Sequence, residues 1–209
     1  MHPRLTVVDH PLAARHLAVL RDATTPSQTF RAVLSDVSVL LLYEGLRDLR
    51  VRETTVETPL EQAPARRLAD DIVVVAIMRA GLGMVDGALR LVPEARVGHL
   101  GVYRDEESLQ AVNYYESLPP HLGGSDVVIA DPMLATGGSA VHALDVVKAQ
   151  SPARVRFVCL VAAPEGLQAL ADHHPEVPVT TASVDDRLDE RGYIRPGLGD
   201  AGDRLYGTT

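Results

Sequence analysis

A carboxylate followed by small and hydroxyl residues stands at the end of an apolar run. The run is Val127–Ala130, Asp131 follows it, and Thr136-Gly137-Gly138-Ser139 opens a helical pattern. Ligands bind at the carboxyl ends of strands in open α/β sheets, and backbone N–H groups at a helix N-terminus bind phosphate. The segment therefore predicts a phosphate site, with Asp131 accepting hydrogen bonds from a sugar or ordering a hydrated Mg²⁺. An ordinary helix N-cap beside a turn is the plainer alternative.

Two arginines also follow apolar runs. Arg79 comes shortly after residues 72–77, and Arg104 follows residues 97–103. The donor fork of arginine matches the oxygens of a diphosphate, so we expect both side chains to bind an anion. The alternatives are a surface ion pair for Arg79 and a solvated charge cluster for Arg104.

The segments that carry these residues alternate between apolar runs and helical patterns. Continuous apolar runs predict strands that are buried on both faces of a parallel sheet. They lie at 72–77, 127–130 and 155–162, with further strands expected at 97–103 and 177–184. Helical patterns follow at 82–91, 138–150 and 164–173. Strands that alternate with helices indicate an α/β fold.

The regions outside this alternation have their own patterns. Residues 1–60 are expected to be helical, with Thr25 as the N-cap of a helix whose capping box ends at Gln28. Residues 104–124 are polar, and residues 185–209 are rich in glycine, so both are expected to be irregular. Irregular segments of this length in a compact domain are usually functional or disordered.

Composition limits the class of protein. The chain has 209 residues, 46% of them apolar and 23% charged, which indicates one globular domain spanning 1–209. Its net charge of −8 argues against nucleic acid or an anionic membrane as the main partner. We find no secretory signal and no apolar stretch of the roughly 18 residues that a membrane span needs, so we expect a cytoplasmic protein. The single cysteine, Cys159, excludes an intrachain disulfide.

The phosphate-site segment can be compared with known motifs. It lacks both the lysine of a Walker A loop and the G-x-G-x-x-G of a dinucleotide site. Residues 131–139 resemble instead the ribose-phosphate loop of the type I phosphoribosyltransferases, in the form found in the uracil phosphoribosyltransferase family. Three further blocks, at 78–84, 97–106 and 192–204, support the same resemblance in the family's order. Pro132 stands where most type I members have a second acid, which is typical of the uracil branch and puts in doubt any mechanism that needs a second carboxylate there.

This resemblance implies a fold. It is a type I phosphoribosyltransferase-like α/β fold, with a twisted, mostly parallel sheet flanked by helices. Helices at 1–60, a protruding arm at 104–124 and a C-terminal hood at 185–209 complete the single domain.

The resemblance also implies a reaction and its residues. The 5-phosphoribosyl group passes from phosphoribosyl diphosphate to N1 of uracil, in pyrimidine salvage. Arg79, Arg104 and Asp131 take the catalytic roles. The phosphoribosyl diphosphate site comprises Arg79, Arg104, Asp131, Pro132, Met133, Leu134, Ala135, Thr136, Gly137, Gly138, Ser139 and Asp200. Mg²⁺ is the implied cofactor; it arrives with this substrate, near Asp200 and without a dedicated protein cage.

The hood is expected to select the base. By the same resemblance, the residues in contact with uracil are Tyr193, Ile194, Gly199, Asp200 and Ala201. Uracil presents an acceptor–donor–acceptor edge, and a rigid backbone offering donor–acceptor–donor would leave buried groups unpaired against cytosine.

Several partners and alternatives stay open at this point. The apolar N-terminal helices and the 104–124 arm favour a homodimer or a higher homo-oligomer. Some relatives respond to GTP, but the sequence identifies no effector site. The competing functions are transfer to another base, a non-catalytic nucleotide sensor or RNA-binding regulator on the same fold, and a generic flavodoxin-like binding module.

Overall fold

A seven-stranded sheet forms the centre of the protein in a computed structural model that describes residues 2–104 and 111–208. The strands lie in the order β1 (Leu5–Val7), β11 (Val179–Thr181), β9 (Arg154–Val158), β7 (Asp126–Ala130), β4 (Ile72–Met78), β5 (Arg96–Arg104) and β6 (Ala111–Ser117). Neighbouring strands are parallel except at the β5–β6 edge, where they are antiparallel. The predicted α/β class with a mostly parallel sheet is confirmed.

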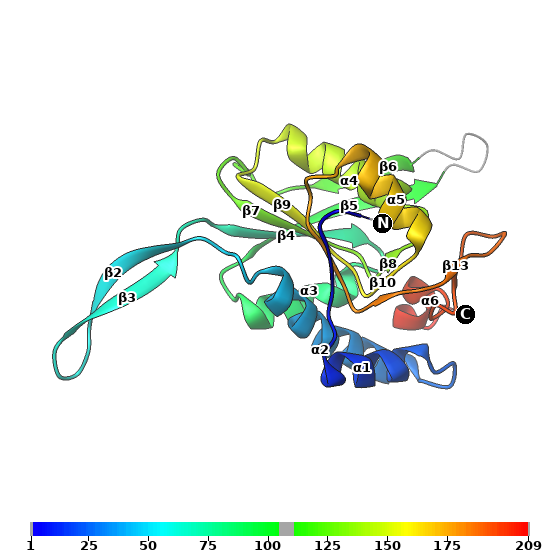
Figure 1. Cartoon of the computed structure of the whole chain (residues 1–209), viewed down its shortest axis with the longest axis horizontal. Coiled ribbons are helices and arrows are strands. Elements are labelled where there is room, and N and C mark those ends of the chain that lie inside the picture. Colours follow the sequence, from blue (N-terminus) through cyan, green and yellow to red (C-terminus); the bar gives the residue numbers. More distant parts are fainter. Residues whose placement is uncertain (1, 105–110, 209) are drawn as a thin grey trace.

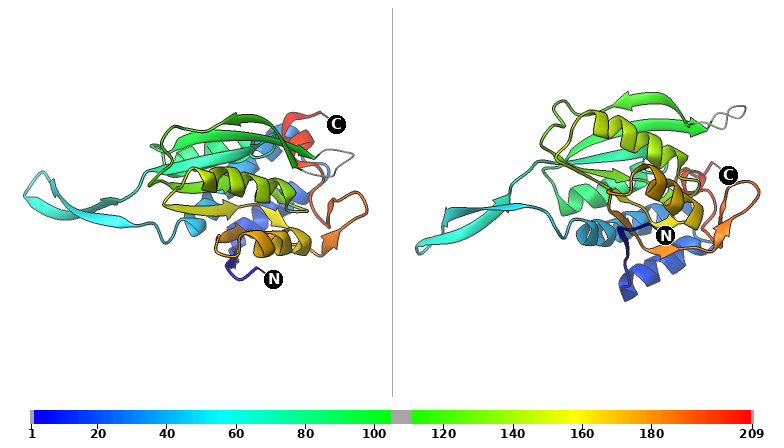
Figure 2. Two further views of the ribbon diagram at one scale, coloured as in Figure 1. Left: turned by 90° about the horizontal axis from the view of Figure 1, so that it is seen from above. Right: turned by 45° about the horizontal axis from the view of Figure 1, so that its top comes forward.

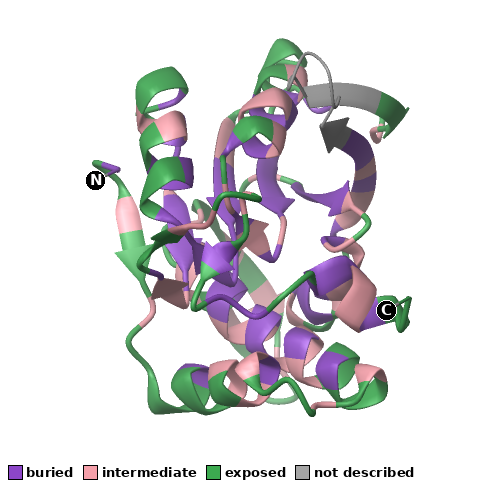
Figure 3. Cartoon of the chain, turned by 90° about the vertical axis from the view of Figure 1, so that its right-hand side faces the viewer, coloured by how far each residue is buried: buried purple, intermediate pink, exposed green. Residues whose placement is uncertain are grey.

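Helices cover both faces of this sheet (Figure 1). On one side lie α1 (Pro11–Arg21), α2 (Ser27–Gly45) and α3 (Leu82–Leu91), and on the other α4 (Gly138–Ala149) and α5 (Pro164–His173). Alternate residues of one strand belong to opposite cores: Val74 packs with the first helix group and Val75 with the second. This is why β4 and residues 127–130 of β7 are continuous apolar runs, with buried residues concentrated in the middle layer (Figure 3).

The helical prediction for residues 1–60 is correct for α1 and α2 but wrong at its end. Residues 51–68 form a hairpin of β2 (Val51–Glu57) and β3 (Gln62–Leu68), which stands away from the body in every view (Figures 1 and 2). Charged residues and threonines make up most of β2, and its side chains are exposed or half-buried, so the strand carries no continuous apolar face that sequence reasoning could find. The expected cap at Thr25 is also wrong: Pro26 is the N-cap of α2, and the Thr25 hydroxyl donates to the Val19 carbonyl at 2.7 Å.

The two segments expected to be irregular contain regular elements. Within 104–124, β6 pairs antiparallel with β5, from Arg104↔Ala111 to His99↔Ser117; residues 105–110 of this arm lie outside the described part of the chain. Within 185–209, β13 (Arg187–Leu188) and β14 (Ile194–Arg195) form a short hairpin, and α6 (Ala201–Tyr206) follows. The described part of the hood is residues 185–208.

A small parallel sheet extends the strand ends toward the hood. It consists of β12 (Ser183–Val184), β10 (Val161–Ala162) and β8 (Met133–Leu134). Each of its strands directly follows a strand of the large sheet, so regular strand pairing continues beyond the carboxyl ends of β7, β9 and β11.

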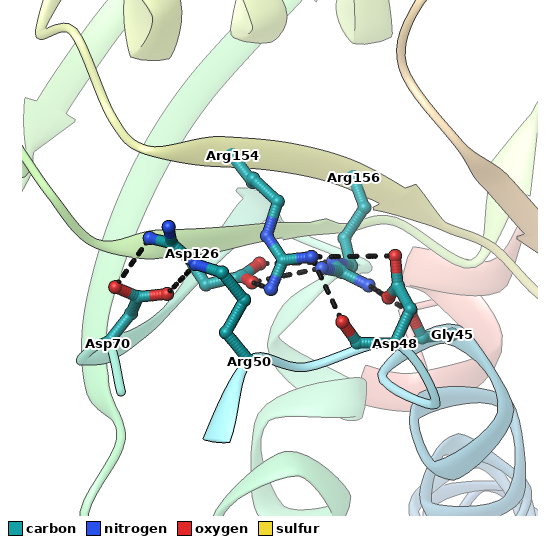
Figure 4. A network of polar contacts seen from close by, with 7 residues as sticks. All are labelled: Gly45, Asp48, Arg50, Asp70, Asp126, Arg154 and Arg156. Carbon is teal, nitrogen blue, oxygen red and sulfur yellow. Dashed lines mark hydrogen bonds and ion pairs between the residues drawn. The ribbon is translucent and has the colours of Figure 1, made fainter. Parts of the chain in front are cut away.

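At the opposite, amino ends of β7 and β9, arginines enclose a buried carboxylate (Figure 4). Asp126 is fully buried and accepts from Arg156 Nε at 3.1 Å and from its Nη2 at 2.9 Å. Arg154 Nη2 lies 2.8 Å from the same carboxylate. Arg156 Nη1 donates to Asp48 at 2.5 Å, just past α2, so this cluster joins α2 to the sheet far from the hood.

The described helices include none that is long and apolar enough to cross a membrane.

Candidate active site

The sheet has a topological switch point between β4 and β7. From β4 the chain passes through α3 to β5 on one side, and then returns to β7 on the other side of β4. Helices diverge at such a point and leave a crevice outside the carboxyl ends of the two strands. Ala76 pairs with Ala130, so Arg79 and Asp131, which follow these strands, both leave the sheet at this crevice.

Asp131 begins the loop that follows β7. Its backbone N–H donates to the Val158 carbonyl at 3.2 Å, and its carboxylate accepts from the Met133 N–H at 3.3 Å. Burial raises the pKa of Asp131 to about 7, against the smaller opposing effect of the Met133 hydrogen bond. The Met133 N–H uses one lone pair of Oδ1, so the side chain keeps acceptor capacity for sugar hydroxyls or for a cation carried by a substrate.

The loop between Asp131 and α4 divides into buried and open positions. Pro132, Leu134 and Gly137 are buried, whereas Thr136 and Gly138 are exposed. The buried residues face the core, so only their backbone can serve a ligand.

Two glycines show why the loop turns as it does. Gly137 has a φ of +86°, and a methyl group there would lie 2.7 Å from the Ala169 side chain. A methyl group on Gly138 would approach only Thr136 Oγ1, at 3.9 Å. The helix N-terminus is thus open toward solvent, with Ser139 half-buried beside it.

Arg79 lies against α6 of the hood. Its Nη2 pairs with Asp203 Oδ1 at 3.1 Å, and 55% of its side chain is exposed. The Tyr206 hydroxyl lies 3.5 Å from the Arg79 carbonyl. A methyl group on Gly202 would lie 3.2 Å from Asp200 Oδ1 and 3.6 Å from Arg79 Nη2, so the structure brings Asp200 and Arg79 together across Gly202.

Arg104 is placed only in part. It ends β5, the neighbour of β4, and the register Met78↔Gly101 puts it beyond the end of β4. Its side chain lies outside the described structure, so its expected contact with diphosphate stays a prediction.

The hood carries the residues expected to contact the base. Tyr193 is 43% exposed, while Ile194 and Ala201, the first residue of α6, are buried in the core. Ile194 and Ala201 can therefore meet a ligand through their backbone only. Gly199, with a φ of +79°, and Asp200 are exposed, which leaves their backbone open to a small ligand.

The hood lies next to the phosphate loop, which is the segment between Asp131 and α4. A methyl group on Gly192 would lie 3.8 Å from Thr136 Cγ2. Glu165, in the first turn of α5, accepts from the Leu188 N–H at 3.1 Å. The hood is thus fixed next to the loop that follows Asp131.

An ion pair missed in the sequence anchors the hood to α1. Arg21 Nη1 donates to Asp185 Oδ2 at 2.7 Å and to the Gly197 carbonyl at 2.8 Å, and its Nη2 donates to Asp185 Oδ1 at 2.5 Å. The Gly197 N–H donates to Asp185 at 2.8 Å. Burial raises the pKa of Asp185, but hydrogen bonds from Arg21, Ser183 and Gly197 outweigh it and hold the pKa below its ordinary value.

Two further arginines join the hood to α2. Arg204 donates to the Leu198 carbonyl at 2.9 Å, and its guanidinium lies 4.5 Å from the centre of the Phe30 ring. Arg31 donates to the Leu205 carbonyl at 2.5 Å. The N-terminal helices therefore serve as the fixed support of the hood, a role that no local pattern of Arg21 or Arg31 could have indicated.

Carboxylates that could meet a metal are few at this site. Within residues 2–104 and 111–208, no three His, Cys, Asp or Glu side chains gather as a metal cluster. Asp131 keeps free lone pairs, and Asp200 uses Oδ1 to cap α6 by accepting from the Asp203 N–H at 2.9 Å. Two separated carboxylates fit a cation that arrives bound to a phosphorylated substrate.

Comparison with known proteins assigns the family. The sequence profile of the family described as uracil phosphoribosyltransferase matches residues 7–208. A uracil phosphoribosyltransferase from Myxococcus xanthus is 56% identical over 207 residues, covering 99% of this chain and 98% of that protein.

Solved structures agree with this assignment. The AQ2163 protein from Aquifex aeolicus superposes with a TM-score of 0.93 at 41% identity, covering 98% of this chain and 99% of that one. A hypoxanthine phosphoribosyltransferase from Trypanosoma cruzi, 11% identical, covers 78% of this chain and 76% of its own with a TM-score of 0.51, which shows a shared fold. The chain belongs to the uracil phosphoribosyltransferase family.

Proposed function

We propose that this protein transfers the phosphoribosyl group of phosphoribosyl diphosphate to N1 of uracil, in pyrimidine salvage. One observation carries the proposal: Arg79 and Asp131 leave adjacent strands at the switch point, beside an open helix N-terminus and beneath the hood. Family membership supports the same reaction.

The phosphate loop binds the ribose 5-phosphate. Backbone N–H groups at the start of α4 and the hydroxyls of Thr136 and Ser139 supply donors. The Asp131 carboxylate accepts hydrogen bonds from the ribose hydroxyls. Since Pro132 and Leu134 are buried, they contribute shape and backbone to the loop, as do Met133, Ala135, Gly137 and Gly138.

Arg79 holds the leaving group, and Arg104 assists it from the β5–β6 arm. The bond between ribose C1 and the diphosphate oxygen breaks, and its electron pair leaves with the diphosphate. A bond then forms between C1 and uracil N1, and N1 loses its proton. Arginine donors fixed where negative charge develops stabilise this transition state. We assign no general base.

Mg²⁺ supplies charge neutralisation on the phosphate oxygens when it is bound. Asp131 and Asp200 are the residues that would hold it, because both carry acceptor capacity beside Arg79 or the phosphate loop. Omission of Mg²⁺, with EDTA present, is expected to abolish diphosphate release.

The hood binds uracil through Tyr193, Ile194, Gly199, Asp200 and Ala201. Its backbone is held by Asp185 and Arg204, which favours recognition by fixed N–H and C=O groups over recognition by flexible side chains. A fixed backbone cannot exchange donors for acceptors to suit cytosine.

Substitution of Arg79 tests this assignment. Arg79→Ala is expected to lower kcat/KM for phosphoribosyl diphosphate by about a hundredfold, the usual loss when a fixed transition-state donor is removed. Arg90→Ala is the matched control, because Arg90 forms an exposed pair with Asp36, on α2. Diphosphate release would measure both variants; equal rates in both would contradict the role of Arg79.

Assembly is the second part of the proposal. A two-stranded hairpin is marginally stable on its own, yet β2–β3 stands clear of the body (Figure 2). We propose that a second copy of the chain covers it in a homodimer. Sedimentation velocity should show a dimer for the full chain and a monomer when residues 52–67 are replaced by a two-residue turn; a monomer in both cases would contradict this.

GTP as an effector and the cytoplasm as the compartment stay predictions. The diphosphate-release assay with and without GTP tests the first of them.

A further inference from the structure

The ion pair between Arg79 and Asp203 links the two halves of the site. Arg79 belongs to the loop after β4, and Asp203 belongs to α6 of the hood. Only Nη2 of Arg79 is engaged, at 3.1 Å from Asp203 Oδ1. The other guanidinium donors have no partner among the residues that the structure describes, so one edge of the fork is held and the other is open.

Asp203 is itself held in place. The Thr208 hydroxyl donates to Asp203 Oδ1 at 2.6 Å, and the Asp203 N–H donates to Asp200 Oδ1 at 2.9 Å. The hydrogen bonds from Thr208 and then from Arg79 lower the pKa of Asp203, so the group is a carboxylate at neutral pH. Its orientation is therefore set before Arg79 meets any ligand.

We propose that Asp203 is a positioning residue for Arg79, and that it keeps the free edge of the guanidinium directed at the diphosphate subsite. This inference rests on the proposed role of Arg79. An arginine that is 55% exposed has many rotamers, and ordering it when substrate binds would reduce affinity. A carboxylate that fixes one guanidinium nitrogen in advance reduces the entropy lost on binding and leaves the remaining N–H donors for the anion.

A competing arrangement can be distinguished from this one. If Asp203 merely occupied the place of the diphosphate, its neutralisation would improve substrate binding. If it positions Arg79, neutralisation weakens binding. The sign of the change in KM for phosphoribosyl diphosphate separates the two.

The test compares two substitutions of aspartate by asparagine, each of which removes one negative charge. Asp203→Asn keeps the shape of the side chain and removes the charge that holds Arg79. Asp36→Asn does the same to Asp36–Arg90, an exposed Arg–Asp pair between α2 and α3 that lies outside the site. We expect Asp203→Asn to raise KM for phosphoribosyl diphosphate about three- to fivefold, the upper range of one partly exposed charge contact, with KM for uracil changed less than about twofold. Asp36→Asn should change neither.

A double-mutant cycle identifies the route of the effect. Binding of phosphoribosyl diphosphate is measured by calorimetry for wild type, Asp203→Asn, Arg79→Ala and the double variant. The proposal predicts that Asp203→Asn has no further effect once Arg79 is alanine. A lower KM in Asp203→Asn, equal changes in the KM of both substrates, or additive effects in the cycle would each overturn it. If Arg79→Ala binds substrate as wild type does, it is the proposed role of Arg79 that fails.

Discussion

At the scale of one residue, Asp131, which we propose as a ligand of the ribose, has an unusual environment. Burial raises the pKa of this carboxyl to about 7, whereas an aspartate in an unfolded chain titrates near pH 4. The folded protein therefore holds the proton more tightly than the unfolded chain does. Stability contributed by this group is lost as the pH rises from about 4 to about 7, and it levels off above that range.

The substitution Asp131→Asn tests this titration in the absence of ligand. Asparagine carries no charge, so the unfolding free energy of the variant should rise relative to that of wild type by about 2.5 kcal/mol between pH 5 and pH 8. Urea denaturation at the two pH values measures the difference. A difference between variant and wild type that is the same at both pH values would contradict a raised pKa.

Sequence reasoning can place residues of this kind at a strand end, while their roles stay predictions. Asp131 and Arg79 follow apolar runs directly, so strand-end chemistry and position are visible in one short segment. Asp203 and Arg21 carry no such signal, because their partners lie 124 and 164 residues away in the chain. Tertiary ion pairs at these separations leave no local pattern.

At the scale of elements, the hood depends on α1. The Arg21–Asp185 pair holds both the N–H and the carbonyl of Gly197, directly before the residues expected to bind the base. Asp185→Asn should raise KM for uracil about tenfold, the loss of one charged hydrogen-bond contact, with a much smaller change in KM for phosphoribosyl diphosphate.

Glu44→Gln is the control for that variant. It removes the charge with which Glu44, on α2, pairs with Arg47 just beyond that helix, where little effect is expected. Steady-state kinetics with each substrate varied in turn measures both variants. If Asp185→Asn raised both KM values equally, α1 would be a general support and would not set the base site.

Elements differ in how well sequence reasoning finds them. The bounds of α3 and α5 match the predicted 82–91 and 164–173, because each follows a buried strand and carries a clear apolar face. The hairpin β2–β3 and the strand β6 were missed because their exposed faces carry polar side chains. Their pairing is set by backbone hydrogen bonds and by a neighbouring strand, which a pattern of side chains does not record.

At the scale of the whole molecule, the proposed site and the Asp126 cluster lie at opposite ends of the sheet. Arg79 directly follows the carboxyl end of β4 and contacts the hood. The Asp126 cluster lies at the amino ends of β7 and β9, beside the root of the hairpin (Figure 4). Asp126→Ala leaves Arg154 and Arg156 without their buried partner and should lower unfolding free energy by about 3–5 kcal/mol.

Asp70→Ala provides the comparison for that cluster. It removes the Arg50–Asp70 pair at the hairpin root, in which the Arg50 side chain is 57% exposed, and it should lower unfolding free energy by about 1 kcal/mol or less. Thermal and urea denaturation measure both variants. If both variants lost the same unfolding free energy, the Asp126 cluster would stabilise the fold no more than an exposed ion pair does.

In the proposed function, a fixed hood selects uracil next to a phosphoribosyl diphosphate site. Diphosphate release by the wild-type protein with phosphoribosyl diphosphate, Mg²⁺ and, in turn, uracil, cytosine, hypoxanthine and adenine tests this directly. We expect turnover with uracil alone. Turnover with a purine would leave the phosphate loop in place but contradict the role given to the hood, and binding of phosphoribosyl diphosphate without turnover on any base would contradict catalysis itself.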